Sequence, residues 1–321
     1  RCKWHFHFKN ISPRGVHFSV LTSHMKHWLS AARPRTLPLA LASILMGGFL
    51  AASTGAFRWD VFGLAALTTV FLQILSNFAN DYGDTVNGVD TAERTVAVRA
   101  VQSGRITARQ MRRAIVLFSA LSLASGSGLL AVAFRDGSWR DVFVFLSLGL
   151  LAIGAAITYT VGRKPYGYLG LGDLSVLLFF GWVGVLGTFY LHTRQFDPLL
   201  LLPATACGLL AVGVLNVNNI RDIENDRRNG KNSIPVRLGK ARASTYHWAL
   251  LLGGFACAVA YVLLRYESAW QWLFVVSLPL LVRIGLGVSR GQRPAEIDPY
   301  LKQMALTTLL FVVAFGVGQL L

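Results

Sequence analysis

The chain has 321 residues, of which 54% are hydrophobic and 14% are charged, and its mean hydropathy is +0.50. An ordinary soluble domain carries about 25% charged residues, so this composition excludes both a plain soluble fold and intrinsic disorder. The three cysteines show neither a disulfide framework nor a metal-ligand spacing. The composition therefore predicts a polytopic membrane protein.

The net charge of +16 comes from 31 Lys and Arg residues against 15 Asp and Glu residues. Basic proteins that bind nucleic acid are usually polar throughout, and this chain is not, so we predict no nucleic-acid partner. In a membrane protein the same excess indicates positive-inside topology or a site for an anionic substrate.

The first 24 residues differ from the rest of the chain. They contain no apolar run of signal-peptide length and no small-residue cleavage pattern, and the first methionine is Met25. We expect an atypical extension at 1–24 that does not belong to the native protein, followed by one membrane domain at 25–321. A native peptide from 1–24, detected by mass spectrometry, would contradict this expectation.

From about residue 36 onward, apolar stretches recur that are long enough to cross a hydrocarbon core about 30 Å thick. Nine of them are candidate membrane spans. They lie at roughly 36–53, 60–80, 114–134, 141–161, 169–191, 198–220, 248–265, 268–287 and 303–321. The predicted fold is an all-α bundle of nine transmembrane helices.

Two of the connections between spans, at 81–113 and 221–247, are long and charged. With nine spans, both lie on the same side of the bilayer as the N-terminus. That side holds 25 of the 31 Lys and Arg residues, and the opposite loops hold five arginines. The positive-inside rule therefore places the long connections in the cytoplasm.

The first long connection opens with polar residues at the end of the second span. If the helix continues through Asp84, then Asn77, Asn80, Asp81 and Asp84 lie at i, i+3, i+4 and i+7 on one helix face. Further charged residues follow, namely Asp90, Glu93, Arg94, Arg99, Arg105 and Arg109.

The second long connection repeats this arrangement after the sixth span. Asp222 and Asp226 lie one helical turn apart. Their polar neighbours are Asn216, Asn218, Asn219, Arg221, Glu224, Arg227, Arg228, Lys231 and Arg237. Clustered carboxylates repel one another and require a cation, and sets of oxygen ligands suit Mg²⁺ bound together with substrate phosphates. Neighbouring Arg and Lys side chains can bind the phosphate oxygens.

The simpler interpretation is that these acids and bases pair within solvated loops. The repeated placement of acids at helix ends, with asparagines beside them, favours a binding site. Tyr159, Arg163 and Lys164 end the fourth span, where the two bases either add cations to the site or anchor the helix at the interface. Asp173 is either functional or stabilises a helix N-terminus.

At these positions the sequence resembles the UbiA-type intramembrane prenyltransferases. The first signature is Asn80-Asp81-Tyr82-Gly83-Asp84 with Gly88-Val89-Asp90, and the second runs from Asn218 to Asp226 and continues through Lys231. Two flanking segments, Ala32 to Pro38 and Pro165 to Asp173, are most similar to the branch that acts on 1,4-dihydroxy-2-naphthoate in menaquinone synthesis. The resemblance covers about Met25 to Leu321.

The resemblance implies a nine-helix bundle around a central cavity, in the cell (inner or plasma) membrane, that joins a polyprenyl diphosphate to 1,4-dihydroxy-2-naphthoate. It assigns Mg²⁺ binding to Asn80, Asp81, Asp84, Asp222 and Asp226. It assigns diphosphate binding to Arg94, Arg99, Lys164 and Lys231. Asp84, Asp222 and Asp226 would be catalytic, and Tyr159 would line the cavity near the allylic carbon.

One departure from that branch is Val96-Ala97, where Gly-Pro is usual, which affects the assignment of Arg99. Two alternatives remain open. The first is the same chemistry on another aromatic acceptor, such as 4-hydroxybenzoate or homogentisate. The second is a cation-coupled transporter, although such folds bind their ions near the bilayer midplane, whereas the acids here lie at one membrane face.

Overall fold

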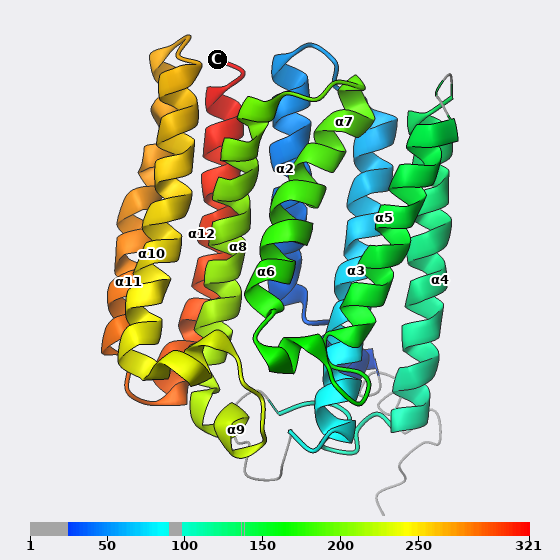
Figure 1. Cartoon of the computed structure of the whole chain (residues 1–321), viewed down its shortest axis with the longest axis vertical. Helices are drawn as coiled ribbons and strands as arrows, with labels where there is room; N and C mark the ends of the chain where they lie inside the picture. Colours follow the sequence, from blue (N-terminus) through cyan, green and yellow to red (C-terminus); the bar gives the residue numbers. More distant parts are fainter. Residues whose placement is uncertain (1–24, 90–97, 136, 138) are drawn as a thin grey trace, which may run out of the picture.

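The computed structural model describes residues 25–89, 98–135, 137 and 139–321 (Figure 1). In this part of the chain, nine helical segments are long and apolar enough to cross a membrane, and no strand occurs. The all-α nine-helix fold is therefore confirmed. The extension at 1–24, the Val96-Ala97 departure, and Asp90, Glu93 and Arg94 lie outside the described residues.

Six of the spans correspond to one labelled helix each. They are α3 (Trp59–Val86), α4 (Ala108–Ala133), α5 (Trp139–Thr158), α8 (Leu201–Arg221), α10 (Ile234–Leu264) and α12 (Pro294–Gly318). Of these, α10 is interrupted by a kink at Gly239. The first span runs from Met25 through the short helix η1 (Pro34–Thr36) into α2 (Leu37–Ser53), and the eighth combines η5 (Ala269–Ser277) with α11 (Leu278–Arg290). A short helix, α9 (Ile223–Arg228), follows α8.

The fifth span combines α6 (Gly172–Val176), the wider π-helical turns of η3 (Leu177–Leu186) and α7 (Gly187–Thr193). Segments of π-helix are rare and occur frequently at functional sites. In Figure 1 this span stands between α8 and the group α3, α4 and α5. It therefore forms a wall between the two halves of the bundle.

Several helices extend beyond the apolar stretches that revealed them. The span predicted at 60–80 continues to Val86, so the condition that the helix reaches Asp84 is met. The spans predicted at 248–265 and 303–321 begin at Ile234 and Pro294. Hydropathy detects only the part of a helix that matches the hydrocarbon core, whereas these polar ends project toward the long connections.

The hydrophobic core is divided into three clusters. The largest joins α2, α8, α10, α11 and α12 around Phe274, Phe311 and Phe315, which are fully buried. The second packs α3 against α4 near Phe78 and Met111, and the third lies where α3, α4 and α7 meet at the opposite end of the bundle. This division leaves room for a cavity between the halves.

Candidate active site

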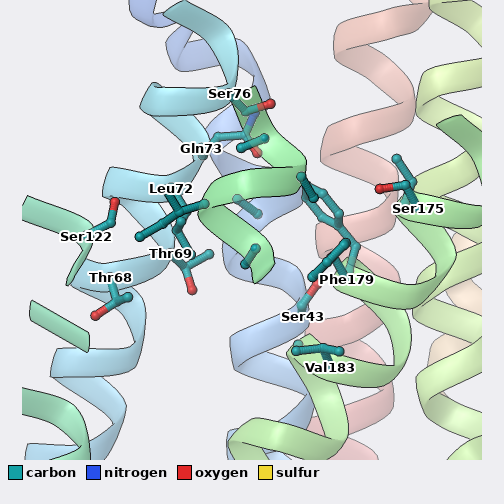
Figure 2. A pocket seen from close by; sticks show the side chains of 18 of the residues that line it. Ser43, Thr68, Thr69, Leu72, Gln73, Ser76, Ser122, Ser175, Phe179 and Val183 are labelled. Atoms are coloured by element: carbon teal, nitrogen blue, oxygen red, sulfur yellow. The ribbon is translucent and has the colours of Figure 1, made fainter. Parts of the chain in front are cut away.

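A cavity of about 380 Å³ lies among α2, α3, α4, α5, η3 and α8. Figure 2 shows part of its lining, including Thr69, Leu72 and Gln73 from α3 and Phe179 and Val183 from η3. From Ala65 to Asp84, α3 contributes lining residues at helical spacing, which corresponds to about 28 Å along the helix axis. The cavity is therefore long, and one helix follows it from end to end.

Apart from Gln73, the charged and amide groups of the lining lie at the end of the cavity near the long connections. They are Arg33, Arg35, Asn77, Asn80, Asp84, Arg99, Asn218, Asn219 and Lys231. The rest of the wall is mostly aliphatic and aromatic, with scattered hydroxyl groups such as those of Ser43 and Ser122 (Figure 2). The cavity thus has one strongly polar end and a long apolar body.

Asp84 is the central carboxylate of the first acidic motif, and its side chain is 1% exposed. Its Oδ2 atom lies 2.8 Å from the Nη2 atom of Arg99, and its Oδ1 atom accepts a hydrogen bond of 2.8 Å from the hydroxyl of Tyr168. Both Asp84 and Arg99 line the cavity.

Asp81, one turn earlier on α3, has different surroundings. Its carboxylate accepts hydrogen bonds from the backbone N–H groups of Ala100 (3.0 Å) and Val101 (3.1 Å). These bonds fasten the segment that carries Arg99 to the end of α3. Asp81 is buried but is not among the residues that line the cavity, and its role as a metal ligand stays a prediction from the sequence.

The end of α3 also approaches the end of α5 very closely. A side chain at Gly83 would overlap the backbone of Thr160, so only glycine allows this approach. Across the same contact, the Thr160 hydroxyl donates to Oδ1 of Asn80 over 3.2 Å. The contact places Tyr159, which follows α5, in the cavity wall. Burial raises the pKa of Tyr159, so its hydroxyl stays protonated at neutral pH.

The second acidic motif lies where α8 gives way to α9. Arg221 ends α8, and its guanidinium binds both carboxylate oxygens of Asp222 at 2.7 Å and Oδ1 of Asp298 on α12 at 2.6 Å. The backbone N–H of Asp226 donates to the carbonyl of Asp222 over 2.8 Å, which holds the two acids one turn apart. The side chain of Asp226 is 1% exposed and lies 3.6 Å from the ammonium of Lys231.

The two acidic motifs meet at Lys231, which is buried in the cavity wall. Burial by itself lowers the pKa of Lys231, but the carboxylates of Asp226 and Asp84 outweigh this effect and raise the pKa above its ordinary value. The ammonium also lies 5.8 Å from the ring centre of Tyr168, within the range of a cation–π contact. One buried cation thus interacts with an acid from each motif.

Hydrogen bonds between the connections hold this arrangement together. The side-chain amides of Asn225 and Asn229 both donate to the carbonyl of Val89, at 3.2 and 3.1 Å. The backbone N–H of Asn232 donates to the carbonyl of Tyr168 over 3.0 Å. The connection after α8 is therefore bonded both to the first acidic motif and to the segment before α6.

Two further polar candidates, Lys164 and Asp173, do not line the cavity. Lys164 is exposed and does not line it, and Arg94 lies outside the described residues. Asp173 is buried and accepts a hydrogen bond of 2.8 Å from the Tyr246 hydroxyl. The Nδ1 atom of His192 accepts from the backbone N–H of Arg58 over 3.1 Å. These contacts are typical of structural roles for Asp173 and His192.

Three residues that sequence reasoning did not assign belong to the site. Tyr168 binds Asp84, Arg221 binds Asp222, and Asn219 lines the cavity beside them. All three lie within the quoted motifs or their flanking segments, so their place in the sequence already indicated that they belong near the site. Their individual partners could not be read from spacing.

Whether the site suits a divalent cation depends on its oxygen donors. Among the described residues, no group of three His, Cys, Asp or Glu side chains is close enough to hold a metal ion, so amide oxygens are needed. Asn80 and Asn219 line the cavity with Asp84. Asn219 is 2% exposed, and in the described part of the chain its Oδ1 atom has no hydrogen-bond partner. Such a set of carboxylate and amide oxygens suits Mg²⁺.

Comparison with known proteins places these features in a family. The UbiA prenyltransferase family model matches residues 40–316. A protein of Escherichia coli named 1,4-dihydroxy-2-naphthoate octaprenyltransferase is 48% identical over 92% of this chain and 97% of its own length. A protein of the same name from Haemophilus influenzae is 47% identical over 94% of this chain and 98% of its own.

Solved structures share the fold at lower identity. An apo UbiA homologue from Aeropyrum pernix has a TM-score of 0.62 and 19% identity, covering 86% of this chain and 96% of its own. A UbiA homologue from Archaeoglobus fulgidus, solved with GPP and Mg²⁺, has a TM-score of 0.60 and 18% identity, covering 90% and 99%.

Proposed function

The chain belongs to the UbiA prenyltransferase family, and on this premise we propose that it transfers a polyprenyl group from a polyprenyl diphosphate to 1,4-dihydroxy-2-naphthoate. Diphosphate and CO₂ are released, and the product is demethylmenaquinone in its reduced form. The observation that carries the transfer chemistry is the meeting of both acidic motifs at Lys231, at the polar end of a long apolar cavity. The acceptor is supported by the relatives with 48% and 47% identity.

The basic side chains at the polar end suit a diphosphate group. Lys231 and Arg99 line the cavity and are both nearly inaccessible to bulk water. A charge held in place within a dry site stabilises the negative charge that develops on a leaving diphosphate, without reorganising solvent. We assign Lys231 and Arg99 to the diphosphate oxygens, and the exposed Lys164 plays no part in this proposal.

Mg²⁺ would be held by oxygens of Asp84, Asn80 and Asn219, which line the cavity. Two other predicted ligands, Asp222 and Asp226, are not among its lining residues. When bound, Mg²⁺ would help to neutralise the diphosphate as the bond between the allylic carbon and oxygen breaks. A UbiA homologue with the same fold was solved with GPP and Mg²⁺, which supports the presence of a cation in this proposal. Asp81 and Asp222 each have both carboxylate oxygens hydrogen-bonded, Asp81 to backbone N–H groups and Asp222 to Arg221, so we assign the metal first to the three lining residues.

The apolar body of the cavity suits the polyprenyl chain and protects the reaction from water. Breaking the allylic bond leaves a cationic carbon, which water would capture in an open site. Tyr159 lies in the wall near the polar end and remains a neutral hydroxyl. The acceptor ring then attacks through the carbon that bears its carboxylate, and loss of CO₂ restores the aromatic ring.

We place the protein in the cell (inner or plasma) membrane with the polar end of the cavity facing the cytoplasm. The distribution of Lys and Arg residues, 25 of 31 on the side of the long connections, supports this orientation. In it, a soluble acceptor and a soluble cation reach the polar end from the cytoplasm, while the polyprenyl chain lies at the depth of the bilayer.

The proposal is tested with purified protein in nanodiscs, supplied with a polyprenyl diphosphate and 1,4-dihydroxy-2-naphthoate. We expect prenylated product, diphosphate and CO₂ in the presence of Mg²⁺, and no product after chelation with EDTA. A parallel panel contains 4-hydroxybenzoate and homogentisate. Faster turnover of either compound would replace the proposed acceptor, and turnover that persists in EDTA would refute the role of the cation.

A further inference from the structure

A second hollow lies on the outside of the bundle, away from the active site. It is a groove of about 520 Å³ between α11 and α12, and α11 lies at the edge of the bundle in Figure 1. Its lining includes Val282, Arg283, Leu286, Arg290, Glu296 and Tyr300. The groove therefore combines an apolar floor with two arginines.

The two arginines are exposed on the same face of α11, seven residues apart. Within the described part of the chain, neither guanidinium has an ion-pair or hydrogen-bond partner. The single acid in the groove, Glu296, is engaged elsewhere, because it accepts hydrogen bonds from the Arg293 side chain and from the backbone N–H of Gln292. The groove thus carries uncompensated positive charge.

The charge of Arg283 is the more costly of the two, because Arg283 lies further from the end of α11 than Arg290 does. It lies about 10 Å along the helix from Arg290, which ends α11. Exposed apolar side chains, Val282 and Leu286, flank it on the lipid-facing surface. A charged side chain at such a position is costly in hydrocarbon, and the cost falls when an anion enters the groove beside it.

A third cation lies at the cytoplasmic mouth of the groove. The ammonium of Lys240 on α10 donates to the carbonyl of Gly291, which lines the groove, and to the side chain of Gln292 over 3.0 Å. The ring of Tyr300 packs directly against Gly287, where any side chain would overlap the ring. This contact sets the width of the groove, and the phenol of Tyr300 forms part of its lining.

We propose that this groove binds the headgroup phosphate of an anionic phospholipid. Arg283 and Arg290 hold the phosphate oxygens, which guanidinium groups match well, and Tyr300 adds a hydroxyl donor. The acyl chains lie along the exposed face of α11, over Val282 and Leu286. Basic pockets between transmembrane helices on the cytoplasmic side are typical sites for anionic lipid headgroups, and the topology places this groove there.

The test uses full-length, delipidated protein in detergent, and native mass spectrometry measures the lipid retained. The probes are phosphatidylglycerol and phosphatidylcholine with identical acyl chains. The variants are R283Q/R290Q and, as a matched control, R242Q, which removes an exposed arginine of α10 that does not line the groove. Inorganic phosphate is added in a separate arm to distinguish a lipid site from a site for the free ion.

We expect the wild type and R242Q to retain phosphatidylglycerol in preference to phosphatidylcholine, and R283Q/R290Q to bind it about tenfold more weakly. R283K, which keeps the charge, should retain the lipid. Equal retention by folded R283Q/R290Q and wild type would overturn the proposal. Displacement of the lipid by millimolar inorganic phosphate would also overturn it. If the double variant does not fold, R290Q alone should show an intermediate loss, and unchanged binding by R290Q would count against the site.

Discussion

Replacing Lys231 tests the proposed active site most directly, because this residue interacts with acids from both motifs. The substitution K231M removes the ammonium but keeps an unbranched side chain of similar length. We expect kcat/KM for the polyprenyl diphosphate to fall by about 10²-fold, which is the usual effect of losing one preorganised group that stabilises developing charge. The acceptor KM should change little.

The same substitution also affects stability. The ammonium of Lys231 lies 3.6 Å from a carboxylate oxygen of Asp226, and both side chains are more than nine-tenths buried. Breaking a buried ion pair usually costs 3–5 kcal/mol. This distance is longer than that of a charge-assisted hydrogen bond, so we expect a loss near the lower limit, about 3 kcal/mol. The activity assay must therefore be run on folded, monodisperse protein.

A second variant separates stability from function. In K231M/D226N both charges are removed, so the uncompensated buried carboxylate is eliminated and much of the stability should return, while activity should remain low. K164M serves as the matched control, since Lys164 is an exposed lysine of the same membrane face that does not line the cavity. We expect K164M to stay within about twofold of the wild type.

The pH dependence follows from the raised pKa of Lys231. A lysine whose pKa is higher in the folded state contributes stability that is fully present below its ordinary pKa of 10.5 and is lost only as the pH rises above it. The contribution of Lys231 to the free energy of unfolding should therefore be constant from pH 6 to 9.

Two results of the activity assay would refute the proposed role of Lys231. The first is a nearly normal kcat/KM for folded K231M, and the second is an equal loss of kcat/KM in K231M and K164M.

Four further predictions address the rest of the site. D84N should reduce turnover by at least about 10³-fold, measured by product formation with saturating Mg²⁺, and residual activity near 10% would contradict its central place. Y168F removes one hydrogen bond to a buried carboxylate and should lower kcat/KM about tenfold, and an unchanged value would show that Arg99 alone positions Asp84. G83V should lower thermal stability by about 2 kcal/mol, because its side chain would overlap Thr160, and a normal melting temperature would refute the close approach. A65F should impair an octaprenyl donor more than a geranyl donor, because Ala65 lines the cavity far from Asp84, and equal losses for the two donors would place the chain elsewhere.

The global architecture could be predicted from the sequence because the bilayer imposes it. A helix that spans the bilayer needs about 20 apolar residues. Each span can therefore be recognised from its own residues, without knowledge of the helices packed against it. The helix ends were less predictable. α10 begins at Ile234 although its apolar stretch begins near 248, and it bends at Gly239, where φ is 72°. Hydropathy does not detect polar residues at a helix end, so the start of α10 at Ile234 could not be predicted from the sequence.

The composition of the site was only partly predictable. Helical spacing placed Asp81 and Asp84 on one face of α3, and both are buried there. Spacing could not show that the segment after residue 98 folds back so that Ala100 and Val101 bind Asp81, leaving Asp84 for the cavity. That distinction depends on a tertiary contact between segments 19 and 20 residues apart.

The two lysines near span ends illustrate the same limit. Lys164 and Lys231 each follow a span on the same membrane face, and the sequence offered no basis for preferring one. In the structure, the backbone N–H of Asn232 binds the carbonyl of Tyr168, and this bond brings Lys231 to the cavity and over the Tyr168 ring. Lys164 lies in the exposed turn after α5. The difference depends on tertiary contacts between distant segments, of which this backbone hydrogen bond is one.

The polarity of α3 along the cavity determines the direction in which a substrate can bind. Its lining residues begin with Ala65 and Thr69, pass through Gln73 and Asn80, and end at the buried carboxylate of Asp84. An apolar chain gains by lying against the first part of this face, and a diphosphate gains only where Arg99 and Lys231 accompany the acids. A transporter that binds its ions at the bilayer midplane would need charged groups accessible in turn from both sides. In the described part of the cavity, the charged groups occupy one end, so the lining favours an enzyme that takes its diphosphate substrate in a single orientation.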